Sequence, residues 1–296
     1  MINMINENEI RISVVIPTYN SWVTLKDCIS SIQKQTLSPY EIIIVDNASS
    51  DSTSENVKAK FPKCKLITLC KNTGVTGGRN KGIENCSSKT DYILFFDHDM
   101  IANKKMLEEL VKTSNLDNQI GIVTPKIYYS NDKKRIWSAG TSINLWTGQV
   151  LFRGGEDVGQ YDNIEEVQVA PAAMLVKKEV LDKVEGFDER YFATYEDTDF
   201  CFRVRISGFK IFYAPKALAY HIIPSDPNNE AVRLLSRAYW VGRNKVIFMK
   251  DYSKNFIIFL FFIPIFTMYY LNLAIKYKKI TSWFQFIRGT LDGVFS

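Results

Sequence analysis

The sequence has few cysteines, which argues against a fold that is stabilised by disulfides or by structural zinc. Its 296 residues include five cysteines, an odd number, and no two of them form a CxxC pair. They lie in apolar or helical contexts. We therefore expect reduced thiols that pack inside a cytosolic protein.

Signals for export and for repetition are also missing. The N-terminal stretch MINMINENEI lacks a basic segment followed by an apolar one, so no secretory signal is predicted. The chain shows no internal repeat and no low-complexity tract. With 46% apolar and 23% charged residues it is globular, and long enough for one large domain or one domain plus an appendage.

Acidic residues are nearly absent from the C-terminal quarter of the chain. Residues 231–296 contain 10 Lys and Arg against 2 Asp and Glu, although the whole chain has a net charge of only +5. The basic character therefore belongs to the end of the sequence. We predict a main domain over residues 1–230 and a basic, apolar helical segment over residues 231–296.

Short apolar runs alternate with helical patterns over the first hundred residues. Such runs, separated by helices, are typical of a parallel sheet that is buried on both faces. The pattern predicts an open, doubly wound α/β sheet, which binds ligands outside the carboxyl ends of its strands. The expected strands are 10–16, 41–46, 64–69 and 92–96, and the expected helices are 21–35, 52–61 and 76–86.

The second half of the chain has a different pattern. Residues 120–129, 149–155 and 167–178 are typical of strands joined by loops, and a helix is expected over 195–208. This half is expected to form a mixed sheet that closes the crevice. A basic amphipathic helix is then predicted over 231–255.

An apolar run of about twenty residues, 256–275, follows this helix. Pro264 would interrupt a helix there, so a single membrane span, an interfacial hairpin and a buried helix pair all remain open. Lysines flank the run, with Tyr and Trp at its edges, which favours a membrane surface over nucleic acid as the partner. These lysines are Lys250, Lys254, Lys276, Lys278 and Lys279.

The stretch DYILFFDHDM places two carboxylates at the end of an expected buried strand. Asp97 and Asp99 are separated by one residue, which allows both to direct oxygen ligands at one cation. Hard divalent ions such as Mg²⁺ or Mn²⁺ bind carboxylates together with substrate phosphates. His98 is expected to be a spacer that faces away, because alternate side chains point to opposite faces.

Two further segments follow expected strands or begin helices near the same edge. NTGVTGGRNKG combines glycines with Arg79 and Lys81, a composition suited either to phosphate binding or to a plain helix start. It matches neither GxxxxGKS nor GxGxxG. Asp46 ends the second strand, and helix capping does not explain it, so it is a candidate acceptor for a base N–H.

YEDTDF offers three carboxylates at the start of an expected helix. Asp199 is four residues before Arg203, which predicts a structural ion pair. Glu196 and Asp197 then remain as candidates for a general base. Carboxylates also favour helix N-termini, so a purely structural role is the alternative.

Taken in order, five segments resemble glycosyltransferase family 2, and in particular its rhamnosyltransferase-like branch that builds surface polysaccharides. The resemblance covers about residues 10–221 and continues weakly through YWVGRNKVIF and FIRGTLDG. The segments are VVIPTYN, IIIVDNASSDST, NTGVTGGRNKG, ILFFDHDM and GFDERYFATYEDTDFCFRVRISGFKIFYAPKALAYH.

This resemblance implies a GT-A fold, a nucleotide-diphosphate sugar donor, a divalent metal and inversion at the anomeric carbon. It implies Asp197 as the base, with Glu196 next to it. The basic, aromatic and apolar C-terminal segment fits a glycan or polyprenyl-linked acceptor at the cytoplasmic side of the cell membrane. The divalent metal would be bound by Asp99, Asp97 and His221. The donor would contact Pro17, Thr18, Tyr19, Asp46, Asn72, Gly78, Arg79 and Asp97.

The chain departs from the family pattern at two places. His98 stands where a third Asp is frequent, and HIIPSDP replaces the glycine and serine that often follow the late histidine. Two alternative functions are less compatible with these motifs. A sugar-nucleotide nucleotidyltransferase would carry a Gly- and Arg/Lys-rich loop after the first strand, where this chain has PTYN. A non-catalytic sugar-nucleotide-binding protein would not need both acidic motifs.

Overall fold

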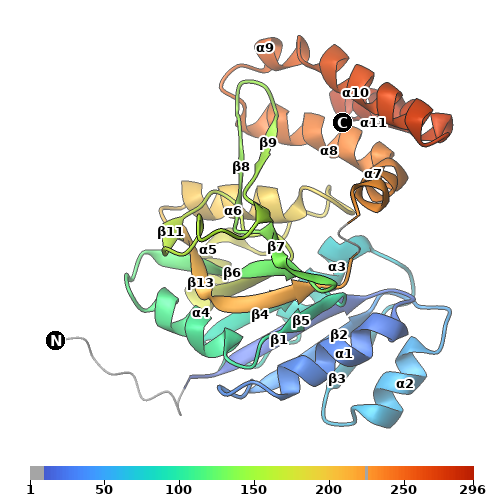
Figure 1. The fold of residues 1–296 in the computed structure, drawn as a ribbon. Coiled ribbons are helices and arrows are strands. Elements are labelled where there is room, and N and C mark those ends of the chain that lie inside the picture. Colours follow the sequence, from blue (N-terminus) through green and yellow to red (C-terminus); the bar gives the residue numbers. More distant parts are fainter. Residues whose placement is uncertain (1–9, 224–225) are drawn as a thin grey trace.

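The computed structural model describes residues 10–223 and 226–296, in which helices surround a mixed sheet (Figure 1). The N-terminal stretch without an export signal, apart from Ile10, and residues 224–225 of the HIIPSDP segment lie outside the described residues. The strands are β1 (Ile12–Thr18), β2 (Glu41–Asp46), β3 (Lys65–Thr68), β4 (Tyr92–Phe96), β5 (Met100–Ala102), β6 (Ile120–Tyr129), β7 (Asp132–Ser138), β8 (Thr141–Ile143), β9 (Val150–Phe152), β10 (Gly155–Glu156), β11 (Glu165–Glu166), β12 (Ala173–Lys177) and β13 (Lys210–His221). The helices are α1 (Trp22–Gln33), α2 (Thr53–Lys60), α3 (Gly74–Glu84), α4 (Met106–Ser114), α5 (Lys178–Val184), α6 (Glu196–Ile206), α7 (Pro227–Ser236), α8 (Ala238–Tyr252), α9 (Phe256–Leu260), α10 (Ile263–Lys276) and α11 (Ile280–Phe295).

The first four strands form the predicted parallel sheet. β1 lies between β2 and β4, β3 lies outside β2, and all three pairs are parallel. Every residue of β1 and β4 is buried, as expected for strands that helices cover on both faces. The carboxyl ends of these strands therefore meet at one edge, with Thr18 beside Asp46.

The second half of the sheet is mixed, as predicted. β12 pairs antiparallel with both β4 and β6, and β13 pairs parallel with β6. The register of β13 shifts between Ala214 and Leu218, a segment that includes Pro215, which cannot donate to a ladder. The short strand β5 pairs with the end of β13 and sets His221 opposite Met100. This pairing brings the late histidine next to the DHD turn.

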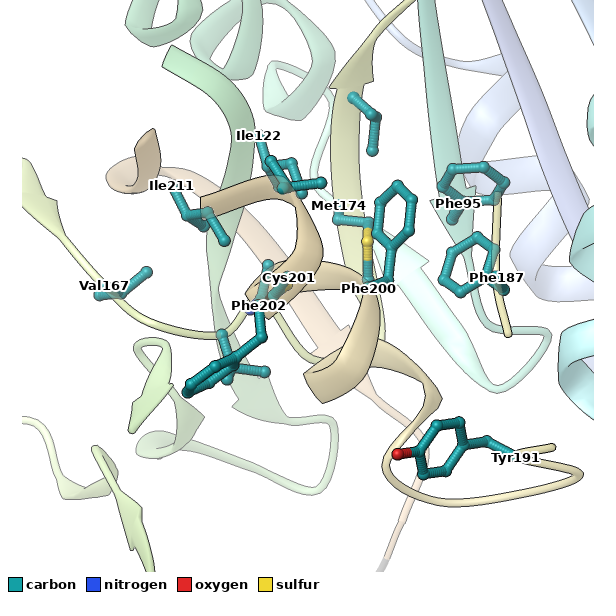
Figure 2. Close-up of a cluster of buried hydrophobic side chains, with 14 of the residues drawn as sticks. Phe95, Ile122, Val167, Met174, Phe187, Tyr191, Phe200, Cys201, Phe202 and Ile211 are labelled. Carbon is teal, nitrogen blue, oxygen red and sulfur yellow. Dashed lines mark hydrogen bonds between the residues drawn. The ribbon is translucent and has the colours of Figure 1, made fainter. Parts of the chain in front are cut away.

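Two apolar clusters hold the layers together, one on each face of the sheet. α1, α2 and α4 pack on one face, while α3, α5, α6 and α8 pack on the other. In Figure 2, Phe200 of α6 lies beside Phe95 and Phe187, and the rings of Phe187 and Phe200 stack with centroids 4.4 Å apart. Full burial of one such side chain contributes about 1.5–3 kcal/mol. Helix α6, which begins at Glu196, is therefore firmly fixed.

The C-terminal helices show that the predicted helix 231–255 is wrong as a single element. It is divided at Arg237, which caps both α7 and α8. No glycine or proline marks this break. It follows from tertiary packing, because Leu235 and Ala238 on either side are both buried against α10 and α11.

Helix α8 belongs to the core of the α/β body. Its residues Val246 to Met249 share one apolar cluster with α6, so the hydrophobic core does not end at residue 230. α11 then packs closely on α8. A Cβ on Gly289 would lie 2.1 Å from the carbonyl oxygen of Tyr239, which only glycine avoids.

The apolar stretch Phe256–Lys276 is long and apolar enough to cross a membrane, and 11% of its most apolar window is buried. It comprises two helices, α9 and α10, and Pro264 lies in the first turn of α10. The predicted interruption near this proline is thus confirmed. One side of α10 packs on α11, where the rings of Tyr270 and Phe286 stack at 4.0 Å.

Candidate active site

A cleft of about 590 Å³ lies at the carboxyl ends of the central strands. This volume is in the usual range for small-ligand sites. The predicted meeting of the PTYN, DNASSD and DHD segments is borne out, since residues of all three line it. The polar and charged lining includes Thr18, Tyr19, Asn47, Asn72, Asp97, His98, Asp99, Glu196, Asp197, His221, Arg233 and Arg237.

Strand β4 carries the DHD turn to one wall of the cleft. The amide of Asp97 donates to the carbonyl of Ala172 at 3.1 Å, and the amide of Ile222 donates to the carbonyl of Asp99 at 2.7 Å. His98 was expected to face away, and this is wrong. It lines the cleft, and its Nδ1 lies 3.1 Å from Oγ1 of Thr24 at the start of α1.

Asp99 and His221 approach each other directly. Oδ2 of Asp99 lies 3.2 Å from Nε2 of His221, although neither imidazole nitrogen makes a hydrogen bond to a described residue. Burial raises the pKa of Asp99. The imidazoles of His221 and His98 and the guanidinium of Arg233 lower this pKa by a larger amount, so the net shift is downward. Asp99 is therefore held as an anion.

The donor set at Asp99 and His221 fits a divalent cation that uses few protein ligands. A buried imidazole without a hydrogen-bond partner, beside a permanent carboxylate, is a suitable pair of ligands. Within the described residues, no group of three or more His, Cys, Asp or Glu side chains gathers at one point. The other ligands would have to be phosphate and water oxygens, the usual situation for Mg²⁺.

Arg79 connects the two walls of the cleft from below. Its fully buried guanidinium donates to Asp97 Oδ1 at 2.8 Å and to Asp197 Oδ1, and it lies 3.8 Å from Oε1 of Glu196. Burial disfavours its charge, but these carboxylates outweigh burial and raise its pKa. The face of Phe187 completes the enclosure, 5.1 Å from the guanidinium carbon.

Glu196 and Asp197 form the opposite wall, at the first turn of α6. Asp197 Oδ2 also accepts the amide of Ala172 at 3.1 Å, whereas Oε2 of Glu196 has no described hydrogen-bond partner. Burial raises the pKa of Glu196 to about 8, and burial also raises that of Asp197. Three carboxylates thus share one buried guanidinium, and Glu196, with a pKa of about 8, holds a proton near neutral pH.

The turn before Glu196 is strained and braced. Thr194 and Tyr195 both adopt left-handed backbone angles, with φ of 66° and 67°. Such angles are unfavourable for these residue types. Asn244 of α8 is fully buried and donates to the carbonyls of Ala193 and Thr194 at 2.8 and 2.9 Å. A C-terminal helix therefore fixes the start of α6.

The predicted donor-binding residues divide into two groups. Pro17, Thr18, Tyr19, Asn72 and Asp97 line the cleft. The other three lie beneath it and are buried. These are Asp46, Gly78 and Arg79.

Asp46, Gly78 and Arg79 each contact other residues of the protein beneath the cleft. Asp46 accepts hydrogen bonds from the amide of Ser49 in the loop that follows it and from the hydroxyl of Ser54 in α2. A Cβ on Gly78 would lie 2.7 Å from Nδ2 of Asn47, so this glycine allows α3 to approach the strand ends. The amide of Val75, in the first turn of α3, donates to the carbonyl of Phe192, which favours the helix-start interpretation of the glycine-rich segment.

Several residues of the site were not singled out from the sequence. Asn47 bridges β2 and α3 by accepting from Thr73 Oγ1 at 2.9 Å. Arg233 and Arg237 were counted only as part of the basic C-terminal segment, although their spacing of four on one helical pattern was a usable signal. The signal for Asn244 was weak, because a single Asn in a helix has no characteristic pattern.

The model of the family described as Glycosyl transferase family 2 matches residues 13–185. Glycosyltransferase AglE of Haloferax volcanii is 24% identical over 259 residues, 81% of this chain and 75% of that protein. The O-antigen chain rhamnosyltransferase WbaN of Salmonella anatum is 25% identical over 223 residues, 75% of this chain and 69% of that protein.

The solved structure of GalNAc-T7 with UDP, GalNAc and Mn²⁺ is similar with a TM-score of 0.60 and 17% identity, covering 82% of this chain and 51% of that chain. At this identity the likeness concerns the fold, and it confirms the predicted GT-A arrangement. The family model covers more than half of the sequence and includes the PTYN, Asp46, Arg79 and DHD segments. The protein therefore belongs to glycosyltransferase family 2.

Proposed function

We propose that this protein is an inverting, metal-dependent glycosyltransferase of surface polysaccharide or glycan biosynthesis. It would move a sugar, rhamnose or another hexose, from a nucleotide-diphosphate donor to a hydroxyl of a glycan or polyprenyl-linked acceptor. The observation that carries the proposal is the Arg79 network, because one buried guanidinium holds Asp97 of the strand wall and Asp197 of the helix wall at a single cleft.

In this proposal the nucleoside occupies the side of the cleft formed by the first strand. Pro17, Thr18 and Tyr19 border that side, and Tyr19 is 46% exposed, which leaves its ring available to a planar base. Asn72 lies at the same side, beside the start of α3. Asp46, Gly78 and Arg79 support this wall from below.

Asp99 and His221 are the residues that would hold Mg²⁺ or Mn²⁺. When bound, such an ion supplies Lewis-acid stabilisation of the charge that develops on the departing diphosphate. The likeness to a fold that holds Mn²⁺ and UDP supports the use of a divalent metal. Asp97 then remains for the donor, and Arg79 fixes its carboxylate.

Asp197 is the proposed base. The acceptor hydroxyl attacks the anomeric carbon from the face opposite the diphosphate, and its oxygen forms the new glycosidic bond. The bond from carbon to the diphosphate oxygen breaks, and its electron pair leaves with the nucleoside diphosphate. Asp197 takes the hydroxyl proton. Its raised pKa suits this task, because a base works best when its pKa is near the working pH.

The proposal is tested by incubating the protein with a panel of nucleotide sugars and measuring release of nucleoside diphosphate with and without Mg²⁺ or Mn²⁺. Release should depend on one donor and on the metal. Failure of every donor to give product in the presence of candidate acceptors would overturn the assignment as an enzyme.

The proposed location is the cytoplasmic side of the cell membrane, with the C-terminal helices at the lipid surface. Large apolar side chains are exposed on α9, α10 and α11, and lysines flank them, which suits an anionic lipid surface. Among these exposed side chains are Phe261, Ile265, Met268, Ile275 and Phe284. Because α10 is packed on α11 along one side, docking in the plane of the membrane is proposed rather than a crossing.

Sedimentation with anionic vesicles tests this location. The double substitution Phe261→Asp and Ile265→Asp should leave most of the protein in the supernatant, while the wild type sediments. Equal sedimentation of the two proteins, or binding of wild type to nucleic acid but not to vesicles, would contradict it.

A further inference from the structure

One almost completely buried lysine of α8 has no role in the steps described above. Lys245 is 8% exposed, and its Nζ donates to the carbonyl of Gly148 at 3.0 Å. The same nitrogen lies 3.5 Å from the ring centroid of Phe266 in α10. Burial lowers the pKa of Lys245 to about 7, and no carboxylate in the described part of the chain opposes this shift. Because lysine is almost never fully buried unless it is paired with an acid, this position needs a specific explanation.

The acceptor of this hydrogen bond, Gly148, lies in the turn of the β8–β9 hairpin. The hairpin is a separate two-stranded sheet that rises from the main sheet to α9 (Figure 1). Its base is held where Nε of Arg153 donates to the carbonyl of Ala139 at 3.0 Å. At its turn, the amide of Lys254 also donates to the carbonyl of Leu145 at 3.0 Å. A two-stranded hairpin is at best marginally stable alone, so the turn depends on these contacts with the helices.

The hairpin forms one border of the cleft. Thr141 of β8 and Val150 and Phe152 of β9 line it, and Thr141 pairs with Phe152 across the hairpin. Alternate residues of a strand share a face, so Val150 and Phe152 present one apolar face to the cleft. Phe152 is 74% exposed, which leaves its ring available to a bound molecule.

This border lies away from the proposed nucleoside side of the cleft. The hairpin follows β7, and in the main sheet β6, β12 and β4 separate β7 from β1. Because the end of β1 is proposed to border the nucleoside, the hairpin is left to border the acceptor. This assignment to the acceptor rests on the proposed function.

Helix α8 contacts two borders of the cleft through consecutive residues. Asn244 donates to the carbonyls of Ala193 and Thr194 in the turn before α6. Lys245 donates to the hairpin on the other side. We propose that Lys245 is a positioning residue of the transfer reaction, which holds the β8–β9 hairpin at the cleft so that its apolar face contributes to acceptor binding.

Hydrogen–deuterium exchange of the full chain, followed by mass spectrometry, tests whether Lys245 holds the hairpin. Lys245→Met keeps the length of the side chain and removes its donor. Amides of residues 141–152 should exchange about tenfold faster than in wild type, because a hydrogen bond that anchors the turn is lost. Amides of β4 and β12 should exchange as in wild type. Lys245→Arg keeps a cationic donor and should lie closer to wild type.

Lys250→Met is the matched control. Lys250 also lies on α8, but it donates to the carbonyls of Val294 and Ser296 instead of the hairpin. This variant should leave the exchange of residues 141–152 unchanged. Wild-type exchange of the hairpin in folded Lys245→Met would overturn the proposal. Equally accelerated exchange in the hairpin, β4 and β12 would also overturn it, because that pattern describes a general loss of core stability.

Steady-state kinetics test the consequence for the reaction, with the donor and acceptor identified by the nucleotide-sugar screen. Lys245→Met should raise the acceptor KM about tenfold and leave the donor KM and kcat close to wild type. Phe152→Ala changes an exposed side chain, so it should fold even if Lys245→Met does not. It should also raise the acceptor KM about tenfold, as expected for loss of an aromatic contact. A normal acceptor KM for Phe152→Ala would contradict the role of the hairpin in acceptor binding.

The two measurements separate this inference from the proposed function. If product forms but hairpin exchange is the same in Lys245→Met and wild type, the proposed function stands and the role of Lys245 fails. If no nucleotide sugar gives product but exchange is faster in residues 141–152 alone, the proposed function fails. Lys245 then stands as the residue that holds the hairpin at the cleft.

Discussion

The two walls of the cleft hold carboxylates in opposite electrostatic settings. On the strand wall, the effect of burial on Asp99 is outweighed by the neighbouring His221, His98 and Arg233, so its pKa is lowered. On the helix wall, burial raises the pKa of Glu196 to about 8 and raises that of Asp197, although Arg79 opposes both shifts. The first wall keeps a permanent anion, and the second can exchange a proton.

This difference in pKa gives the two walls two different kinds of chemistry, which a single acidic motif could not provide. A permanent carboxylate suits a cation, whereas a carboxylate with a raised pKa suits general acid–base work. Arg79 allows the two acidic walls to lie at one cleft, because its guanidinium neutralises part of the negative charge of Asp97 on one wall and of Asp197 on the other. Substitutions on either wall should therefore have distinct effects.

The largest effect is expected for Asp197→Asn. This change keeps the shape of the side chain but removes its capacity to take a proton, so kcat should fall by about 10²–10⁴-fold. Binding of the nucleotide sugar should change little. The measurement is steady-state turnover together with donor affinity by calorimetry.

Glu196→Gln is the matched control for that experiment. It removes a neighbouring carboxylate that already holds a proton near neutral pH, so turnover should drop far less. The opposite ranking, with Asp197→Asn active and Glu196→Gln inactive, would transfer the role of base to Glu196.

A smaller but still severe effect on stability is expected for Arg79→Met. The substitution leaves the carboxylates of Asp97, Glu196 and Asp197 without their common, fully buried partner. Breaking a buried pair in this way destabilises proteins by about 3–5 kcal/mol. The measurement is denaturant-induced unfolding at neutral pH.

Lys81 provides the comparison on the same helix. Its ion pair with Glu84 is exposed, with side-chain accessibilities of 43% and 60%. Lys81→Met should therefore cost at most about 1 kcal/mol. Similar losses for the two variants would mean that the buried network does not hold the walls together.

Asn244→Ala should reduce turnover moderately, because Asn244 supports the turn that precedes Glu196 and Asp197 on the helix wall. The carbonyls of Ala193 and Thr194 would lose their buried donor, and the strained turn before Glu196 would relax. We expect kcat to fall about tenfold, which corresponds to a barrier higher by about 1.4 kcal/mol, with an unchanged donor KM.

A purely structural role would instead lower stability alone. Asn228→Ala removes an amide oxygen that accepts a hydrogen bond from Tyr277 at the surface, and it should leave kcat unaltered. A normal kcat for folded Asn244→Ala would show that the turn keeps its shape without this brace.

The sequence was informative where burial decides the structure. β2 and β4 were predicted with their observed ends, because apolar strands of a parallel sheet are continuous and their polar residues gather at one edge. The pair of Asp199 and Arg203 was also predicted correctly from helical spacing, and it is formed at 2.8 Å.

Contacts between distant segments could not be predicted in this way. Arg79 and Asp197 are 118 residues apart, and nothing in the glycine-rich segment indicates that the guanidinium points inward. The break at Arg237 was missed for the same reason. Its local sequence is compatible with a continuous helix, and the packing of α7 on α10 and α11 decides otherwise.

The smallest expected effect is a pH-dependent difference in stability between wild type and Glu196→Gln. The folded protein holds a proton on Glu196 with a pKa of about 8, raised from 4.5 by burial and by Asp197, with Arg79 opposing. The stability that this proton contributes is fully present below about pH 4.5 and is lost as the pH rises through about 8.

Wild type should therefore lose stability relative to Glu196→Gln between pH 5 and pH 8, because glutamine needs no proton to remain buried. The midpoint of thermal unfolding should shift in favour of the variant by about 2–4 °C for each kcal/mol gained. Glu84→Gln, at an exposed position of α3, should show no such trend. A difference between wild type and Glu196→Gln that stays constant over this range would mean that Glu196 is ionised in the folded protein, and the contrast between the two walls would then rest on Asp197 alone.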